Sequence, residues 1–225
     1  MEKKYSPRGQ KLVNLLKKQI IIMDGAMGTM IQKYKLEEKD FRGDRFKNPK
    51  VDLKGNNDLL SITRPEIIEE IHALYLKAGS NIIETNTFSG TKIAQADYHL
   101  EDAVFDINTE SAIIAKRACE KFMQKNPSQE CFVAGAMGPT NRTASISPDV
   151  NNPDFRAVTY DDLVENYYDQ AKALLDGGVD ILLPETIFDT LNVKAALFAI
   201  SRLQEEVDFR IPVMISVTIT DNSGR

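Results

Sequence analysis

The sequence lacks any apolar run long enough to cross a bilayer. Its uninterrupted apolar stretches, such as residues 20–23, are far shorter than the about 20 residues that a transmembrane helix needs. The N-terminal segment carries several charges and lacks the apolar centre of a secretory signal. We therefore expect a cytoplasmic protein that does not use a membrane as partner.

Cysteine and histidine are also scarce, with two of each. Cys119 and Cys131 cannot build a disulfide framework and do not have the spacing of a metal site. Cys119 lies in a helical run and Cys131 opens an apolar strand, so we expect both to be packing residues. His72 and His99 have no second ligand nearby, which favours structural or surface roles.

The chain has no strong excess of either charge. It contains 28 Lys+Arg and 33 Asp+Glu, for a formal net charge of −5. This balance gives no electrostatic basis for binding nucleic acid. With 225 residues, 42% of them hydrophobic, the chain can bury one sizeable core, and we expect one domain over residues 1–225.

Short apolar runs alternate with helical patterns, which predicts βαβ units and a parallel sheet. The nearly continuous apolar character of the runs is typical of strands covered on both faces. The five predicted strands are residues 19–24, 81–84, 131–135, 180–183 and 213–219.

Capping signals mark the helices between these strands. Thr63 and Glu66 have the spacing of a capping box, and Gly79 is placed to end the helix that follows. A second helical pattern ends at Gly177, and a third begins near Asp189, a plausible N-cap.

Repeated helix–glycine–strand units predict a (β/α)8 TIM barrel, with an additional N-terminal helix at about residues 8–18. Such a barrel needs eight units and typically about 250 residues. We count about five of the eight units, so we expect the domain to be incomplete at its C-terminal end. A doubly wound open sheet is the alternative, but the sequence has no GxGxxG fingerprint.

Glycines and polar residues follow the ends of the predicted strands, where barrel enzymes have their active sites. Backbone N–H groups near the glycines can bind a carboxylate, and Asp24 or Glu185 can pair with an ammonium group. Such a site suits an amino acid. The candidate substrate-binding residues are Asp24, Gly25, Gly28, Thr29, Asn86, Thr87, Glu185 and Thr218.

Each of these features also has a structural interpretation. The glycine-containing loop after Asp24 can be a simple turn, and Glu84 and Glu185 can be paired with basic residues. Asn86, Thr87 and Thr218 can bond to backbone groups at the strand ends. Only their coincidence at one end of the predicted barrel favours a functional site.

Long motifs give the chain a family resemblance. The motifs are MDGAMGTMIQ, DFRGDRF, LKGNNDLL, IIETNTF, GAMGPTNRTASISPDVN and ETIFDTLNVKAALFA. With them the chain, from about residue 20 to residue 225, resembles the N-terminal homocysteine-binding module of the cobalamin-dependent methionine synthases. DFRGDRF, KGNND and NRTASISPDV distinguish this branch from the betaine-type homocysteine methyltransferases.

The resemblance implies a barrel in which three cysteine thiolates hold zinc and homocysteine sulfur is the fourth ligand. The sulfur would attack methylcobalamin to give methionine, and methyltetrahydrofolate would remethylate cobalamin on another module of the same full-length chain. The family's zinc-binding cysteines lie in segments that we expect after Arg225. We therefore expect this chain alone to hold neither zinc nor cobalamin and to be inactive.

The resemblance also assigns roles to residues. Asp24 and Glu185 match the acids that engage the homocysteine ammonium group, and the backbone around Gly28 and Thr29 matches the carboxylate site. Asn86, Thr87 and Thr218 would line the pocket. Pro184 stands where the family more often has an aliphatic residue, which predicts a strand end or a bend before Glu185.

Two other interpretations remain open. The chain can belong to a related thiol methyltransferase that uses another methyl donor. It can also be a non-catalytic fragment that keeps part of the amino-acid pocket and self-associates through the open edge of its barrel.

Overall fold

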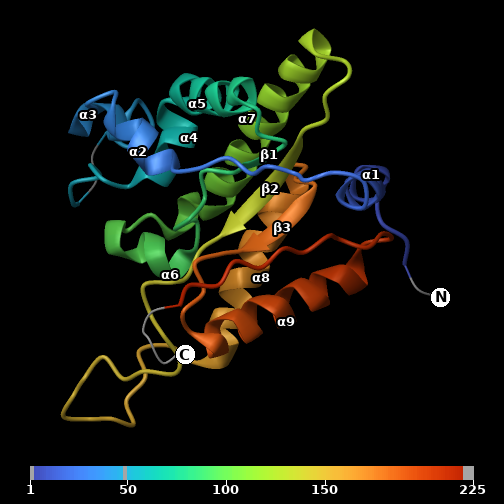
Figure 1. Cartoon of the computed structure of the whole chain (residues 1–225). Helices are drawn as coiled ribbons and strands as arrows, with labels where there is room; N and C mark the ends of the chain where they lie inside the picture. Colours follow the sequence, from blue (N-terminus) through green and yellow to red (C-terminus); the bar gives the residue numbers. More distant parts are fainter. Residues whose placement is uncertain (1–2, 48–49, 220–225) are drawn as a thin grey trace.

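The computed structural model describes residues 3–47 and 50–219, which form an α/β fold with a parallel sheet at its centre (Figure 1). The strands are β1 (Ile82–Glu84), β2 (Phe132–Met137) and β3 (Ile181–Pro184), and they pair in the order β1-β2-β3. Across residues 3–47 and 50–219, no helix has the length and apolar character needed to span a membrane.

Two further segments extend the sheet at its edges. Met23 forms a parallel bridge with Ile82 of β1, and Val213 forms one with Leu182 of β3. Five parallel segments therefore lie side by side in chain order. This consecutive order is that of a (β/α) barrel, whereas a doubly wound sheet reverses its order at a switch point.

The prediction of regular strands at residues 19–24 and 213–219 is wrong. Each segment forms only isolated parallel bridges. The first segment bonds to β1 at two places: the Ile22 carbonyl accepts from Ile82 N (3.0 Å), and Asp24 N donates to the Ile82 carbonyl (2.9 Å). An edge segment with a ladder on one side has half the backbone bonds that hold a central strand. The three central predictions are confirmed to within a few residues.

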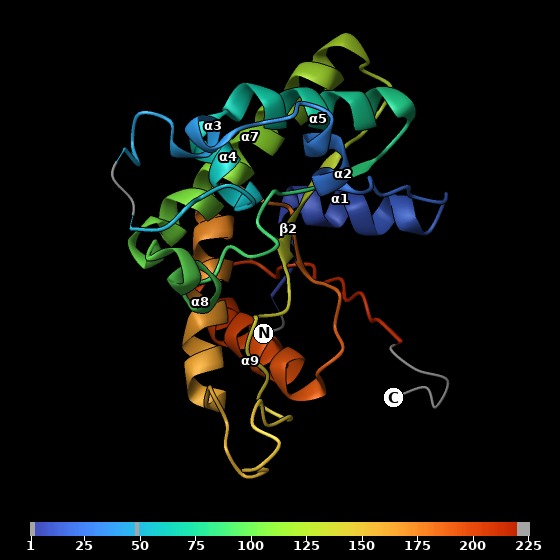
Figure 2. The same ribbon diagram turned by 90° about the vertical axis from the view of Figure 1, so that its left-hand side faces the viewer.

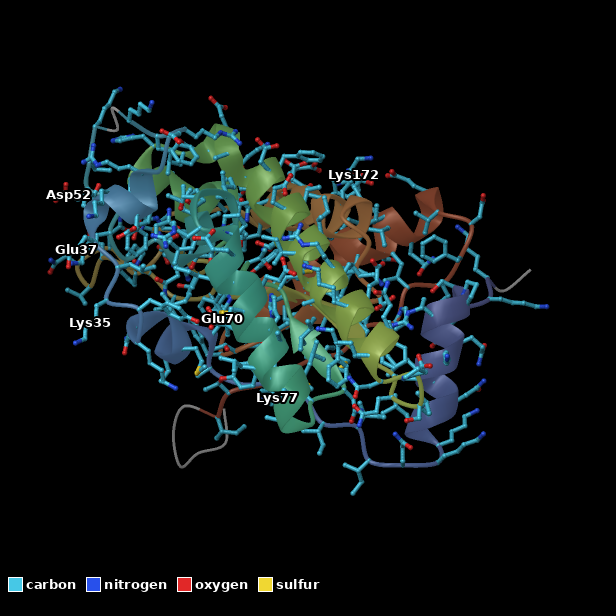
Figure 3. The ribbon with its side chains drawn as sticks, turned by 90° about the horizontal axis from the view of Figure 1, so that it is seen from above. Lys35, Glu37, Asp52, Glu70, Lys77 and Lys172 are labelled. Atoms are coloured by element: carbon cyan, nitrogen blue, oxygen red, sulfur yellow. The ribbon has the colours of Figure 1, made fainter. Side chains whose placement is uncertain are left out.

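Helices cover the outer face of the sheet. The main ones are α5 (Pro65–Ala78), α7 (Val104–Lys125), α8 (Tyr160–Asp176) and α9 (Thr190–Glu206). Exposed charged residues such as Glu70, Lys77 and Lys172 lie on the solvent side of these helices (Figure 3). The shorter helical elements are α2 (Met27–Gln32), α3 (Glu38–Arg42), η1 (Asn57–Leu59), α4 (Leu60–Thr63), α6 (Lys92–Gln95), η2 (Ala96–Tyr98) and η3 (Glu101–Ala103).

The predicted capping box of α5 is wrong. Thr63 is the last residue of α4, and its hydroxyl donates to the Leu59 carbonyl. The N-cap of α5 is Arg64, which Pro65 forces out of the helical conformation (φ −141°, ψ 53°). The Arg64 side chain pairs with Glu66 instead (2.6 Å).

The predicted helix boundaries at Gly79, Gly177 and Asp189 agree with the structure. Gly79 ends α5 in the left-handed conformation (φ 113°), which a side chain would strain. Gly177 follows α8 directly. Asp189 is the N-cap of α9, and its Oδ1 accepts from the N–H of Leu191 at 2.8 Å.

The N-terminal helix α1 (Pro7–Leu16), which ends two residues earlier than predicted, covers the inner face of the sheet. Leu12 is buried there in a cluster with Phe132 and Ile181, and Figure 2 shows β2 between α1 and α8. The Arg8 guanidinium stacks 4.5 Å from the Phe132 ring centroid and lies 3.3 Å from Asp180 Oδ1. Helix α1 therefore closes one end of the apolar interior.

Leu12→Ala should lower the free energy of unfolding by about 2–5 kcal/mol, because it opens a cavity in this buried cluster. The matched control is Leu16→Ala in the same helix, where the side chain is 55% exposed; it should change stability by less than about 0.5 kcal/mol. Urea unfolding of both variants measures the difference. Equal losses would show that α1 is not packed as described.

Candidate active site

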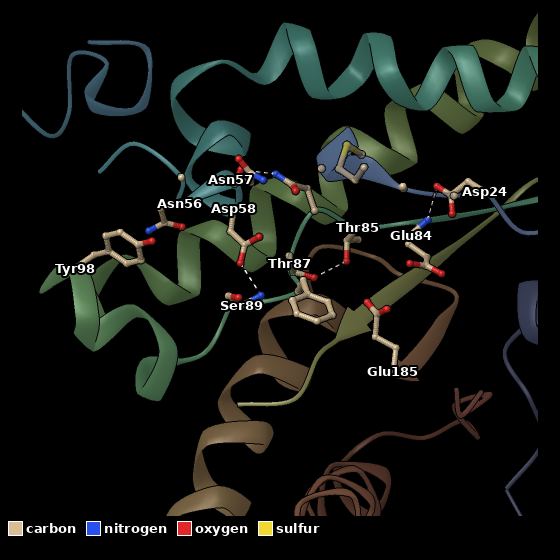
Figure 4. A pocket seen from close by; sticks show the side chains of 17 residues that line it. Asp24, Asn56, Asn57, Asp58, Glu84, Thr85, Thr87, Ser89, Tyr98 and Glu185 are labelled. Atoms are coloured by element: carbon tan, nitrogen blue, oxygen red, sulfur yellow. Dashed lines mark hydrogen bonds between the residues drawn. The ribbon is translucent and has the colours of Figure 1, made fainter. Parts of the chain in front are cut away.

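A cavity of about 480 Å³ lies at the carboxyl ends of the Met23 segment, β1 and β3 (Figure 4). The loops that follow Asp24, β1 and β3 contribute to its wall, together with the turn at η1. The lining residues are Asp24, Gly25, Ala26, Met27, Gly28, Gly55, Asn56, Asn57, Asp58, Glu84, Thr85, Asn86, Thr87, Phe88, Ser89, Tyr98 and Glu185.

Four carboxyl groups line this cavity, and none of the lining residues that the structure describes is Lys, Arg or His. Side chains alternate between the two faces of a strand. Glu84 therefore lies on the same face as Ile82, and Glu185 on the same face as Leu183, which places both acids above the apolar interior. Asp24 and Asp58 complete the set.

Asp24 has one oxygen bonded and one without a partner. Its Oδ2 accepts from the N–H of Glu84 at 3.0 Å, whereas Oδ1 is buried without a hydrogen-bond partner. Burial raises the pKa of Asp24 to about 7, against the effect of its backbone bonds and with a smaller contribution from Glu185. A buried oxygen without a partner is energetically costly, so this position favours an additional donor.

The neighbouring acids are perturbed in the same direction. Burial, followed by repulsion from Glu185 and Asp24, raises the pKa of Glu84 to about 8. Burial also raises the pKa of Glu185, against a weak bond from the Thr186 hydroxyl. Asp24 and Glu84 therefore hold protons more strongly than free carboxyl groups do.

The position of Glu185 agrees with the expected strand end at Pro184. β3 ends at Pro184, yet Glu185 N still donates to the Met137 carbonyl of β2 at 3.1 Å. The next residue, Thr186, has a positive φ of 54°, and Ile187 beyond it forms a parallel bridge with Val217. The proline therefore does not move Glu185 away from the cavity.

The structure brings most of the predicted site residues together and leaves two outside. Asp24, Gly25, Gly28, Asn86, Thr87 and Glu185 line the cavity. Thr29 is exposed on α2, and Thr218 is exposed beside Ile187, whose carbonyl accepts from its N–H. Neither threonine side chain is among the lining residues.

Asn86 and Thr87 use their side chains to hold the loop after β1. Asn86 Nδ2 donates to the Asn57 carbonyl at 2.7 Å, and the Thr87 hydroxyl donates to the Ala136 carbonyl at 2.7 Å. The structural interpretation of these two residues is therefore confirmed, while a contact with substrate stays a prediction.

Sequence reasoning placed Glu84 at a strand end without counting it among the substrate-binding residues, and it missed Asp58 and Tyr98. Alternation along β1 is a signal that could have identified Glu84. Asp58 lies in the KGNND motif, which the resemblance marks without giving it a role. No pattern in the sequence points to Tyr98.

The two cysteines lie in the core, as predicted. Both are buried between α7 and β2, and the Cys131 thiol donates to the Cys119 carbonyl at 3.4 Å. His72 is buried in α5, where burial lowers its pKa to about 4. Among the described residues, no three His, Cys, Asp or Glu side chains are grouped so that they could hold a metal ion. These residues therefore do not fit a three-thiolate zinc site.

Comparison with known proteins identifies the family of the chain. The profile of the family Homocysteine S-methyltransferase matches residues 21–225, so the chain belongs to that family. The fold resembles homocysteine methyltransferase MmuM from Escherichia coli. For its metallated form the TM-score is 0.72 at 24% identity, over 93% of this chain and 67% of that one.

Two other crystal structures of the same Escherichia coli enzyme are also similar. The oxidized form gives a TM-score of 0.70 at 24% identity, over 93% of this chain and 66% of that one. The apo form gives 0.64 at 22% identity, over 92% and 63%. The chain thus spans about two thirds of the length of these proteins. The likeness shows an α/β fold of this barrel type, with a partial sheet of three parallel strands.

The raised carboxyl pKa values predict that the protein loses stability as pH rises. Folded-state values of about 7 for Asp24 and about 8 for Glu84 exceed the ordinary values of 3.8 and 4.5. The folded state therefore binds more protons than the unfolded state, and the free energy of unfolding should fall between about pH 4.5 and pH 8.

Glu84→Gln should reduce this slope and make the protein more stable than wild type at pH 8. The control is Glu110→Gln on the exposed face of α7, which should leave the slope unchanged. Urea unfolding at pH 5 and pH 8 measures both effects. A slope that Glu84→Gln leaves intact would contradict the assignment.

Proposed function

We propose that the cavity binds homocysteine by its amino-acid end and presents the sulfur for methylation. The observation that carries the proposal is the group of four carboxyls without a basic residue among the lining side chains, in a chain of this family. An ammonium group is the counter-charge that such a group favours.

The ammonium group would lie between Asp24 and Glu185. Asp24 Oδ1 is buried and lacks a donor, and an ammonium group has three. Glu84 at the end of β1 and Glu185 just after β3 lie at the same edge of the sheet. Both carboxyl groups add to the local negative charge. Binding would therefore be coupled to the release of protons from these acids.

The substrate carboxylate would bind backbone N–H groups around Gly25 and Gly28. Gly28 lines the cavity, while Thr29 would contribute through its backbone, since its side chain is exposed. A role of Thr218 in the pocket stays a prediction.

The acids that bind the ammonium group oppose formation of a thiolate. A negative sulfur near Glu84 and Glu185 is disfavoured by the same repulsion that raises the pKa of these acids. The described residues therefore favour the neutral thiol, and a positive charge from elsewhere is needed to favour the thiolate. Zinc supplies this kind of activation in proteins generally.

We further propose that the full-length protein is a cobalamin-dependent methionine synthase, which transfers a methyl group from methylcobalamin to homocysteine. The six motifs of the sequence support this finer assignment. The zinc-binding cysteines would lie after Arg225, and the folate- and cobalamin-binding modules would belong to the same chain. A homocysteine methyltransferase with another methyl donor is the competing proposal, and dependence of the full-length protein on methylcobalamin separates the two.

A binding fragment that self-associates is a candidate of another class. Ile20 is 88% exposed at one edge of the sheet, and Val217 and Ile219 are 63% and 64% exposed at the other. Apolar edge segments of this kind favour pairing with further chain. A concentration-independent monomer in sedimentation experiments would contradict self-association.

The ammonium assignment predicts which ligands bind. Homocysteine should bind in a calorimetric titration, whereas 4-sulfanylbutanoate, which lacks only the ammonium group, should bind at least about tenfold more weakly, as expected for a lost charge-assisted hydrogen bond. Glu185→Gln should weaken homocysteine and leave the analogue unchanged, and Glu110→Gln should affect neither. Equal binding of both ligands would contradict the proposal.

Metal analysis tests the proposed position of the zinc ligands. The present chain should hold no stoichiometric zinc, whereas the full-length protein should hold about one ion, as a three-thiolate site does. Cys119→Ser and Cys131→Ser should leave the zinc content of the full-length protein unchanged. Stoichiometric zinc in the present chain that either substitution removes would overturn this assignment.

A further inference from the structure

The KGNND motif forms one wall of the cavity by bonding to the loop after β1. We refer to residues 56–58 as the η1 turn and to residues 86–89 as the β1 loop. Asp58 Oδ2 accepts from Ser89 N at 2.7 Å, and the Asn57 carbonyl accepts from Asn86 Nδ2 at 2.7 Å. These bonds join two segments that are about thirty positions apart in the sequence.

Gln95 of α6 strengthens the same connection. Its amide bonds to Asn56 at 2.7 Å and donates to the Ser89 carbonyl at 3.1 Å. Ser89 is therefore held at its N–H by Asp58 and at its carbonyl by Gln95. All three partner side chains are buried, with exposures of 4% for Asn56, 5% for Asp58 and 0% for Gln95.

The β1 loop is also confined on its other side. A Cβ atom at Gly138 would lie 2.3 Å from the Phe88 carbonyl oxygen, so the loop and the segment after β2 are in close contact. Gln170 of α8 donates to the Thr87 carbonyl at 3.0 Å. A loop held between these two sides has little freedom to move, and at Ser89 the N–H donates its bond to Asp58.

Asp58 lies apart from the acids assigned to the ammonium group. Figure 4 shows it on the side of the cavity next to Asn56 and Tyr98, away from Asp24 and Glu84. Burial raises the pKa of Asp58 to about 7, while its bond from Ser89 N has the opposite effect and Glu185 a further raising effect. Tyr98 and Asp58 also interact electrostatically.

We propose that Asp58 is a positioning residue, which holds the β1 loop in place through the Ser89 amide and thereby shapes the amino-acid site. This inference rests on the proposed function for its ligand, since the loop carries Asn86 and Thr87 at the cavity wall. Asp58 acts by accepting a hydrogen bond, so a neutral acceptor of the same shape replaces it.

Three variants test this role in the 225-residue chain. Asp58→Ala removes the acceptor, Asp58→Asn keeps an acceptor oxygen without the charge, and Asp154→Ala is an exposed control. Asp58→Leu fills the same space without an acceptor and replaces Asp58→Ala if that variant does not fold. Hydrogen exchange of residues 86–90 is measured without ligand, and L-homocysteine affinity is measured by calorimetry.

Asp58→Ala should accelerate exchange at Ser89 about ten- to a hundredfold, as expected for a lost bond to a charged acceptor, and should weaken homocysteine binding about tenfold or more. Asp58→Asn should restore both values to within about threefold of wild type, a distinction that general destabilisation would not produce. The control should match wild type.

Unchanged exchange in Asp58→Ala would overturn the proposal. The proposal would also be overturned if Asp58→Asn protected the loop but bound homocysteine as weakly as Asp58→Ala does. That result would mean that the carboxylate contacts the ligand directly. If wild type binds no homocysteine, the proposed function fails, and the exchange rates still decide whether Asp58 holds the loop.

Discussion

Parallel pairing in chain order is the constraint on which the rest of the structure depends. Since β1, β2 and β3 are adjacent and parallel, their carboxyl ends lie at one edge of the sheet. Alternation along each strand then separates outward residues, which pack against helices, from inward ones. Glu84 and Glu185 each stand two positions after an inward apolar residue and therefore lie on the inner face. They line the same cavity although they are about a hundred positions apart in the sequence.

The two ends of the interior differ in the kind of side chain that they bury. At one end of the interior Leu12 and Phe132 pack together and Arg8 pairs with Asp180. The other end buries four carboxyls that have no basic partner among the described lining residues. Burial costs an ionised acid a large part of its hydration, so the acids hold protons until a cation replaces them. Burial of these acids thus lowers the free energy of unfolding, and their negative charge favours binding of an ammonium group.

Much of this arrangement could be predicted from the sequence. Continuous apolar runs indicated the central strands. Gly79 and Gly177 marked the ends of two helices and Asp189 the start of a third. These signals are local, so they can be recognised without the tertiary structure. Thr63 was misplaced because Pro65 and the preceding helical turn override the capping pattern. The edge strands were overestimated because their regularity depends on a second neighbour, and Asp58 was missed because its bond to Ser89 joins distant segments.

The most direct test of the account is a crystal structure of the chain with homocysteine. The account predicts the ammonium nitrogen within about 3.2 Å of Asp24 Oδ1, with the substrate carboxylate at the backbone around Gly28. Homocysteine bound outside this cavity, or with its carboxylate toward Asp24 and Glu185, would contradict it.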